Sequence, residues 1–370
     1  MNIAIIDADL IGRSRHSTPN LACMKISGYY KALGHDVTLK LDYKGLSKFD
    51  KVFISKVFTD TPIDESVLLL SNVEYGGTGF YYDKAPNLPD EIEHHMPDYT
   101  LYSKWVEDRV AAGDKPNRYH DYVRSSIGFT SRGCFRKCDF CVNKKYDRAF
   151  KHSPVSEFLD PSRPVISLWD DNFLACAEWR SILEDLLATN KYIQFRQGLD
   201  IRLITDEKAQ MFSKIKKIRD YTFAFDHIED REIIEEKLAI WKKYVITSTK
   251  LYVLCGYDRQ DKWDADFWNK DIIDTFERIK ILMKYGCMPY LMRFNRYEES
   301  PHRGIYITLA RWCNQPSMFK NKSFREFCCE TKGVGESATR YFKEFEKNHP
   351  EIAKEYFDLR YRELNQYSRM

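Results

Sequence analysis

Three cysteines stand close together near the middle of the chain, as Cys134, Cys138 and Cys141. Three thiolates on one short loop could hold three irons of a four-iron cluster, whereas electron-transfer clusters normally use four cysteines. Zinc binding is the second alternative. A structural zinc site takes four ligands, and the nearest histidine downstream that could be the fourth is His152. Three unrelated core thiols are the third alternative. Because Phe140 precedes the third cysteine and the spacing agrees, we favour an iron–sulfur cluster whose fourth iron is open to a ligand.

The composition limits the classes of protein to be considered. The chain has 370 residues, of which 43% are hydrophobic, and a net charge of +3, which gives no support to bulk nucleic-acid binding. Ten cysteines are too few for a disulfide scaffold. The longest aliphatic runs, Ile3–Ile6 and Val67–Leu70, are far shorter than the ~20 residues of a membrane helix. The first residues lack a secretory signal pattern, so we expect a cytoplasmic protein with reduced thiols and no membrane contact.

Six short apolar runs predict β-strands, and the first leads directly into the cysteine loop. They are Ser126–Thr130, Val165–Trp169, Tyr192–Arg196, Tyr221–Phe225, Leu251–Cys255 and Pro289–Arg293. Amphipathic patterns between most of them predict the helices Glu178–Ala188, Asp206–Ile218, Asp230–Tyr244 and Lys270–Tyr285. Strands that alternate with helices or long connections are typical of parallel α/β structure. The pattern predicts a partial parallel (β/α)6 barrel.

The regions before and after the predicted barrel differ from it. Strand and helix signals alternate at Ile3–Ile6, Leu21–Leu33, His35–Leu41, Val52–Val57 and Val73–Tyr75. We therefore expect a small Rossmann-like α/β domain over residues 1–100, a connector over 101–125 and the barrel over 126–300. Charged helical patterns at Gly335–Asn348 and Glu351–Gln366, interrupted by Pro350, predict a helical C-terminal extension over 301–370.

The segment Ser131-Arg132-Gly133-Cys134-Phe135-Arg136-Lys137-Cys138-Asp139-Phe140-Cys141 resembles the signature of radical S-adenosylmethionine enzymes. The resemblance covers about Ser126–Asn295. It implies a 4Fe-4S cluster on Cys134, Cys138 and Cys141, with S-adenosylmethionine chelating the open iron and Phe140 beside it. One-electron reduction then cleaves the sulfonium, and a 5′-deoxyadenosyl radical abstracts hydrogen from the substrate. A flavodoxin-like or ferredoxin-like electron donor is the implied partner.

Polar residues follow the second predicted strand, where parallel barrels place their sites. Asp170 and Asp171 stand there, and the resemblance implies that this strand end contacts the amino group of the methionine moiety. A carboxylate suits an ammonium partner. The alternative is an N-cap for the following helix, a role that Asp171 or Asn172 could fill.

Further polar residues follow later strands. Gln197, Asp200 and Arg202 stand after the third strand, where they could meet ribose hydroxyls, the methionine carboxylate or the substrate. An internal Asp200–Arg202 salt bridge is equally open. Asp226 and Arg293 end the fourth and sixth strands and are candidate catalytic residues by position alone.

The N-terminal region resembles, more weakly, the cobalamin-binding-like domain that precedes the barrel in one radical subgroup. Asn20-Leu21-Ala22, Ala32-Leu33-Gly34-His35-Asp36-Val37, Ser55-Lys56-Val57 and Gly76-Gly77 carry the likeness, but no Asp-x-His-x-x-Gly motif occurs. This implies possible cobalamin binding; the alternative is a degenerate Rossmann-like domain that packs on the barrel or binds a partner.

Basic and aromatic residues interleave around the cysteine loop. They are Arg132, Arg136, Lys137, Lys144, Lys145, Arg148 and Lys151, with Phe135, Phe140, Tyr146 and Phe150. Such a patch could guide a phosphate-bearing or nucleic-acid substrate. A solvated loop that also docks an acidic electron donor is the alternative.

Three functional hypotheses follow. The first is a radical S-adenosylmethionine enzyme acting on a substrate that the sequence does not identify. The second is a cobalamin-dependent methyltransferase of the same family. The third is a non-catalytic iron–sulfur or zinc protein that senses redox state or binds nucleic acid.

Overall fold

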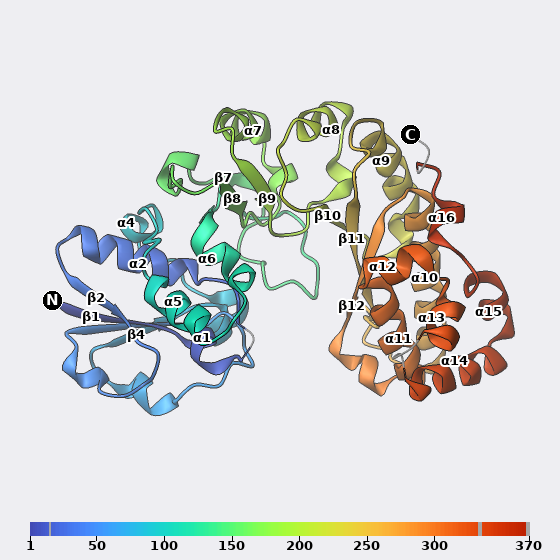
Figure 1. The fold of residues 1–370 in the computed structure, drawn as a ribbon, viewed down its shortest axis with the longest axis horizontal. Helices are drawn as coiled ribbons and strands as arrows, with labels where there is room; N and C mark the ends of the chain where they lie inside the picture. The colour runs from blue at the N-terminus through green and yellow to red at the C-terminus, as the bar shows by residue number, and fades with distance from the viewer. Residues whose placement is uncertain (15, 332–334, 368–370) are drawn as a thin grey trace. The chain divides into compact units, whose positions relative to one another are not determined.

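The computed structural model describes residues 1–14, 16–331 and 335–367, and its chain divides into two units (Figure 1). Unit 1 comprises Met1–Gln197 together with Lys216–Ile218. Unit 2 comprises Gly198–Ile215 and Arg219–Met370. The chain thus passes from unit 1 to unit 2 directly after Tyr192–Arg196, the third strand predicted for the barrel.

Unit 1 begins with a four-stranded parallel sheet in the order β2-β1-β3-β4. The strands are β1 (Asn2–Asp7), β2 (Asp36–Leu39), β3 (Lys51–Ser55) and β4 (Val73–Gly76). Ile3 and Ile5 of β1 belong to one apolar cluster, and Ala4 and Ile6 belong to another. A parallel sheet that is covered on both faces needs such a continuous apolar strand. The α/β character predicted for this region is confirmed.

Helices cover this sheet and continue beyond it. They are α1 (Ala8–Gly12), α2 (Leu21–Ala32), α3 (Thr78–Tyr81), α4 (Asp90–Glu93), α5 (Ser103–Ala111) and α6 (His120–Arg124). Asn20 caps α2 by accepting a hydrogen bond from the Cys23 N–H at 3.2 Å. Tyr102 and Val106, at the start of and within α5, are buried in the same cluster as Ile3 and Ile5.

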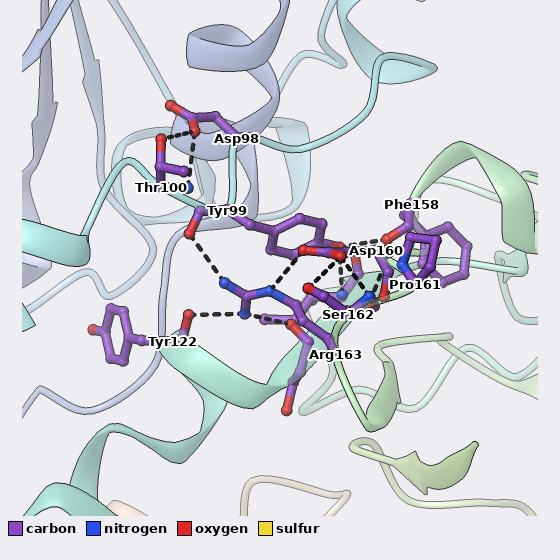
Figure 2. A network of polar contacts seen from close by, with 12 residues as sticks. Asp98, Tyr99, Thr100, Tyr122, Phe158, Asp160, Pro161, Ser162 and Arg163 are labelled. Atoms are coloured by element: carbon purple, nitrogen blue, oxygen red, sulfur yellow. Dashed lines mark hydrogen bonds and ion pairs between the residues drawn. The ribbon is translucent and has the colours of Figure 1, made fainter.

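A buried arginine ties α6 to the second sheet of unit 1 (Figure 2). The Arg163 guanidinium donates to the carbonyls of Tyr122 (2.9 Å), Ser125 (3.0 Å) and Tyr99 (3.0 Å). It also lies 4.3 Å from the centroid of the Tyr99 ring and 3.3 Å from the Asp160 carboxylate. An arginine at the end of a helix satisfies carbonyls that the helix leaves unpaired, so Arg163 fixes where the next strand begins.

The second sheet of unit 1 carries the cysteine loop. Its parallel strands β5 (Ser125–Gly128), β8 (Val165–Leu168) and β9 (Tyr192–Phe195) are ordered β5-β8-β9, with Val165 opposite both Ser125 and Tyr192. After β5 the antiparallel pair β6 (Ser131–Arg132) and β7 (Phe150–Lys151) encloses the loop. Helix α7 (Trp179–Ala188) connects β8 to β9.

Unit 2 contains a third parallel sheet, in the order β10-β11-β12. The strands are β10 (Tyr221–Ala224), β11 (Thr249–Cys255) and β12 (Met288–Arg293), joined by α9 (Arg231–Tyr244) and α10 (Ala265–Lys284). Trp241 of α9 is fully buried and donates from its indole Nε1 to the Thr249 hydroxyl at 2.9 Å. All six strands predicted for residues 126–300 are therefore present, each within two residues of its predicted ends.

Two helix predictions need correction. Helix α8 (Asp206–Ser213) ends five residues before Ile218, because the backbone of Lys216 and Lys217 pairs with Ile193 of β9. Helix α10 begins at Ala265, five residues before Lys270, because the Asp264 carboxylate caps it through the Phe267 N–H at 2.8 Å.

The predicted barrel is not confirmed. Its six strands fall into two three-stranded parallel sheets, one in each unit, and among the described residues no strand pairing joins β9 to β10 as a ladder. What the structure establishes is a mixed α/β fold with parallel sheets.

The C-terminal region is helical, as predicted, but the helix predicted over Glu351–Gln366 is two short helices, because the chain turns at residues 357–360. It contains α11 (Arg303–Cys313), α12 (Pro316–Asn321), α13 (Phe324–Glu330), α14 (Glu336–Asn348), α15 (Pro350–Tyr356) and α16 (Tyr361–Leu364). Pro350 begins α15, the position where proline is best tolerated. Phe342 of α14 packs against Phe324 and Phe357, so these helices bury an aromatic core. Within the described ranges, no helix has the length and apolar character needed to cross a membrane.

Candidate functional site

The cysteine loop runs between β6 and β7. Cys134, Cys138 and Cys141 are half-buried and form no disulfide, and the Cys141 N–H donates to the Cys138 carbonyl at 3.0 Å. Gly133, which precedes the loop, has φ +87°, and a Cβ there would lie 2.2 Å from the Arg148 carbonyl oxygen. Glycine is therefore required at the entrance of the loop.

Nitrogen donors face two of the three sulfurs. The Arg136 N–H lies 3.3 Å from the Cys134 Sγ, and the Asn143 N–H lies 3.4 Å from the Cys141 Sγ. Asn172, which follows β8, donates from its side-chain Nδ2 to the Cys134 Sγ at 3.3 Å. Hydrogen bonds to cysteine sulfur stabilise the thiolate and tune the potential of a bound cluster.

The donor set fits an iron–sulfur cluster in its chemistry. Three cysteines share one loop, and the sulfurs of Cys134 and Cys141 receive N–H donors, which is the environment that cluster sulfurs use. Within the described ranges, however, no three His, Cys, Asp or Glu side chains are gathered closely enough to hold a metal ion. The three thiols therefore share a loop without converging on one point.

Asp170 holds the end of β8 to the chain that follows β5. Its Oδ1 accepts hydrogen bonds from the Thr130 hydroxyl (2.9 Å), the Ser131 hydroxyl (2.8 Å) and the Ser131 N–H. Burial raises the pKa of Asp170 to about 6, although these hydrogen bonds oppose the shift. Its Oδ2 is buried without a hydrogen-bond partner. Asp170 is therefore built into the wall behind the loop.

The next two residues face the loop and a cavity. The Asp171 Oδ2 accepts from the Gly133 N–H at 2.6 Å and lies 3.5 Å from the Arg132 Nε. Asn172 occupies the N-cap of the short 3-10 helix Phe173–Ala175 but makes no side-chain cap, because its amide is turned to Cys134. Asn172 was not among the predicted site residues; its place as the third polar residue after the strand was the available signal.

A cavity of about 540 Å³ opens beside the loop, entirely within unit 1. The first sheet and the segments that follow its strands contribute Asp9, Asn20, Ser55, Val57, Phe58 and Thr78. The second sheet and the cysteine loop contribute Arg132, Asn143, Trp169, Asp171, Arg196 and Gln197. This volume is in the range that drug-sized ligands and cofactors fill. Of the predicted site residues in unit 1, Asp171 and Gln197 line the cavity, whereas Asp170 does not.

Two buried carboxylates support the wall of the cavity at the end of β1. Asp9 accepts from the Val57 N–H (2.7 Å) and the Thr61 hydroxyl (2.5 Å). Asp7 accepts from the Tyr102 hydroxyl at 2.9 Å, and burial raises its pKa to about 7. His16, which lines the cavity, has a buried Nε2 with no hydrogen-bond partner, 3.9 Å from the Asp7 carboxylate.

The remaining predicted site residues lie in unit 2. The Asp200 carboxylate accepts from the Arg202 Nε at 2.7 Å, and Arg202 also donates to Asp230 at 2.7 Å, so the internal salt bridge is formed. Asp226 accepts from the Leu254 N–H at 3.3 Å, and burial raises its pKa. Arg293 is exposed, with its guanidinium 4.4 Å from the centroid of the Tyr297 ring.

A second cavity, of about 460 Å³, lies within unit 2 at the ends of β10 and β11. Asp226, His227 and Asp271 are among its lining residues, together with Arg278. Arg278 is buried and donates to the carbonyls of Phe225 (3.1 Å), Asp226 (2.6 Å) and Leu254 (2.8 Å).

Comparisons with known proteins give little. No family model matches the chain, and no curated protein matches it. Two solved structures align with it, both of the cobalamin-dependent S-adenosylmethionine radical enzyme OxsB, one with aqua-cobalamin bound and one apo. They share 11% and 12% sequence identity with this chain, and both have a TM-score of 0.38. The alignments cover 99% of this chain but only 58% of the OxsB chains. A likeness this low carries no weight for fold or function.

Proposed function

We propose that this chain is a radical S-adenosylmethionine enzyme. The observation that carries the proposal is the Cys134-x3-Cys138-x2-Cys141 loop, which Asn172 and Asp171 attach to the end of β8 beside the cavity. When bound, a four-iron cluster with S-adenosylmethionine would supply reductive cleavage of the sulfonium and hydrogen abstraction from a substrate.

The side chains around the cavity have distinct tasks in this proposal. We assign the three cysteines as the cluster ligands and Phe140, which directly precedes Cys141 in the chain, as a residue beside the cofactor. Asp171 is the carboxylate available to an ammonium group, because it lines the cavity whereas Asp170 is enclosed by Thr130 and Ser131.

Other polar groups belong to the same proposal. Gln197 lines the cavity and can exchange hydrogen bonds with ribose or substrate. Asp226 and Arg293 remain proposed substrate-facing residues, and Asp200 and Arg202 proposed cofactor contacts. The partial barrel built from all six strands is part of the proposal as well.

Cobalamin fits the cavity poorly. A corrinoid with its nucleotide tail is larger than the drug-sized ligands that fill cavities of ~300–1,000 Å³, and the cavity of about 540 Å³ lies in the lower half of that range. S-adenosylmethionine with a small substrate matches the volume better. We therefore assign no step to cobalamin.

The basic surface of the loop favours an acidic electron donor as partner. Phe135 and Val142 are exposed there, at 44% and 42% of their surface. Lys137 is already paired with Asp147 at 2.6 Å, and the Lys144 ammonium donates to the Asp139 carbonyl at 3.0 Å. We propose a flavodoxin-like or ferredoxin-like electron donor as the partner of this surface; guidance of a phosphate-bearing or nucleic-acid substrate is its alternative role.

Anaerobic reconstitution tests the proposed function. The protein is loaded with iron and sulfide, reduced with dithionite and given S-adenosylmethionine, and 5′-deoxyadenosine is measured by chromatography. We expect about four irons per chain and product formation, both lost in Cys138→Ala. Cys329→Ala is the matched control, because Cys329 is an exposed cysteine in unit 2. Uptake of zinc without a cluster would contradict the proposal, and corrin absorbance after loading with cobalamin would restore the methyltransferase alternative.

A further inference from the structure

Beside the cavity, unit 1 contains a chain of titratable side chains to which the proposed function assigns no task. At its inner end, Lys25 and Glu93 both line the cavity, and the Lys25 ammonium donates to the Glu93 Oε1 at 2.9 Å. Only 5% of the Lys25 side chain is exposed. A lysine so deeply buried needs a partner for its charge, yet this pair also faces open space in which a ligand can bind.

From Glu93 the contacts continue away from the cavity. The His152 Nε2 lies 3.5 Å from the same Glu93 Oε1, and the His152 Nδ1 lies 2.9 Å from the Ser153 hydroxyl. The Ser153 hydroxyl is in turn 3.4 Å from the His94 Nδ1. The rings of His94 and His152 are stacked, with centroids 4.9 Å apart.

The outer end of the chain reaches the solvent. The His94 Nδ1 lies 2.8 Å from the Glu157 carboxylate, and 40% of the His94 side chain is exposed. By contrast, His152 has 13% of its side chain exposed, and Ser153 is buried. The chain thus runs from a buried pair at the cavity, through a buried middle, to an exposed imidazole.

We propose that Lys25 and Glu93 form a proton-transfer site on the wall of the cavity. A relay of His152, Ser153 and His94 connects this site to the solvent. The site suits a ligand with a hydroxyl, amine or carbonyl group, because these groups exchange hydrogen bonds and protons with an ammonium.

The directions of the hydrogen bonds are compatible with such a relay. The His94 Nδ1–H is shared between the Glu157 carboxylate at 2.8 Å and the Ser153 hydroxyl at 3.4 Å. If the Ser153 hydroxyl then donates to the His152 Nδ1, the His152 Nε2–H points at Glu93. Burial lowers the pKa of His152 to about 4, against the opposing charge of Glu93 and with the positive charges of Arg132 and Lys25 nearby. His152 is therefore neutral at pH 7, and a neutral imidazole has the one donor and one acceptor that this arrangement needs.

The transfer balances without any change in electrons. Lys25 gives one proton to the ligand and recovers one through Glu93 from the His152 Nε2. His152 recovers a proton at Nδ1 from Ser153, Ser153 recovers one from the His94 Nδ1, and His94 takes one at Nε2 from water, which leaves as hydroxide. Both imidazoles then have the other tautomer and return to the first one before the next transfer. With every step reversed, the same chain removes a proton from the cavity.

Nuclear magnetic resonance of the full chain tests the relay without cluster, cofactor or substrate, so its result is independent of the proposed function. With nitrogen-15 in histidine, we expect His152 to carry its proton on Nε2 and to titrate with a pKa of about 4. In Ser153→Ala, the hydrogen-bond signature at the His152 Nδ1 should disappear. A proton on Nδ1, or a pKa at the ordinary value of ~6.5, would overturn the relay.

Exchange of the Lys25 ammonium protons with water gives the second readout. We expect Ser153→Ala to slow this exchange by about tenfold, because it removes the relay and leaves only direct contact with water in the cavity, where 5% of the Lys25 side chain is exposed. Ser126→Ala is the matched control, since Ser126 is equally buried in unit 1 but bonds to the backbone of Asp160. His94→Ala should slow the exchange as well, and imidazole added to the buffer should restore it. Exchange that is unchanged in both Ser153→Ala and His94→Ala would refute the proposal.

Discussion

Unit 1 and unit 2 differ in how many of their buried polar side chains have hydrogen-bond partners. In unit 2, Arg202 is shared between Asp200 and Asp230, and Arg278 donates to three carbonyls. In unit 1, several buried polar atoms lack a hydrogen-bond partner, among them the His16 Nε2, Asp170 Oδ2, Asn172 Oδ1 and Gln194 Oε1. Over the described ranges, Trp263 is the single residue of unit 2 with such an atom.

This difference separates polar groups that hold a fold together from polar groups that await a ligand. Buried polar atoms are normally paired, so a cluster of unpaired ones calls for an explanation such as a bound molecule or water. In unit 1, His16 and Arg132 with such atoms line the cavity, and Asn172 contacts Cys134 of the loop. Both units contain a structural buried arginine, Arg163 and Arg278, but unpaired buried polar atoms beside a cavity are found in unit 1.

The largest expected effect comes from removing the buried arginine of each unit. Arg163→Met and Arg278→Met each leave three carbonyls without their donor, and we expect each to lower the free energy of unfolding by about 3–5 kcal/mol. Hydrogen exchange should show the loss confined to unit 1 for Arg163→Met and to unit 2 for Arg278→Met. If either variant lowered the protection of backbone amides equally in both units, the two units would not differ in the way described above.

The next effect concerns the pH dependence of unit 1. The pKa of Asp7 in the folded protein, about 7, lies above the ordinary value of 3.8, so its contribution to stability is complete below pH 3.8 and is lost as the pH rises through 7. The loss is at most about 4 kcal/mol, at 1.36 kcal/mol for each pKa unit.

Asp7→Asn removes this titration and should therefore stabilise the protein at pH 8 more than at pH 5. Denaturant unfolding at the two pH values measures the difference. Comparison with the wild type at each pH isolates Asp7 from His16, whose pKa burial lowers and whose effect has the opposite sign. An Asp7→Asn effect that is the same at both pH values would show that Asp7 is ionised throughout.

A smaller effect is expected from glycines with positive φ. Gly133→Ala combines the strained φ with a clash against the Arg148 carbonyl, whereas Gly113→Ala has φ +101° and open space around it. We expect Gly113→Ala to cost about 1–2 kcal/mol, the intrinsic price of the left-handed conformation. Gly133→Ala should cost more and also reduce iron uptake, as measured by iron analysis after reconstitution. Equal iron uptake by the two variants would show that the loop entrance does not position the cysteines.

The smallest expected effect is on a bound cluster. Asn172→Leu removes the side-chain N–H that faces the Cys134 Sγ, so the reduction potential of the cluster should become more negative. Asn143→Ala is the matched control, because Asn143 reaches the Cys141 Sγ through its backbone N–H. A potentiometric titration monitored by electron paramagnetic resonance measures the reduction potential of the cluster in both variants. An unchanged potential in Asn172→Leu would place Cys134 outside the ligand set.

Much of the fold could be predicted from local pattern. The short apolar run at Val165–Leu168 predicts a strand that is buried throughout, and the amphipathic pattern from Asp206 predicts the start of α8, which Thr205 caps. Long-range pairing could not be read in this way. Helix α8 stops early because Lys216 and Lys217 pair with Ile193, a contact between segments that are remote in sequence.

The candidate site was also predicted only in part from the sequence. The spacing of the cysteines marks the loop, but it does not show which aspartate faces the cavity. Asp170 and Asp171 are adjacent, and side chains alternate at a strand end, so one turns inward to Thr130 and the other toward Gly133. The contact of Asn172 with Cys134 and that of His152 with Glu93 depend on tertiary packing, which one sequence does not reveal.

The three-residue return of Lys216–Ile218 to unit 1 bears on how this protein could be cut or recombined. Because the chain crosses between the units at residues 197–198, 215–216 and 218–219, no single crossover point separates them. A fragment ending at Gln197 would leave the backbone of Ile193 without its partner, and an exposed strand edge invites association with other chains. The two units are therefore expected to be inherited, and expressed, as one piece.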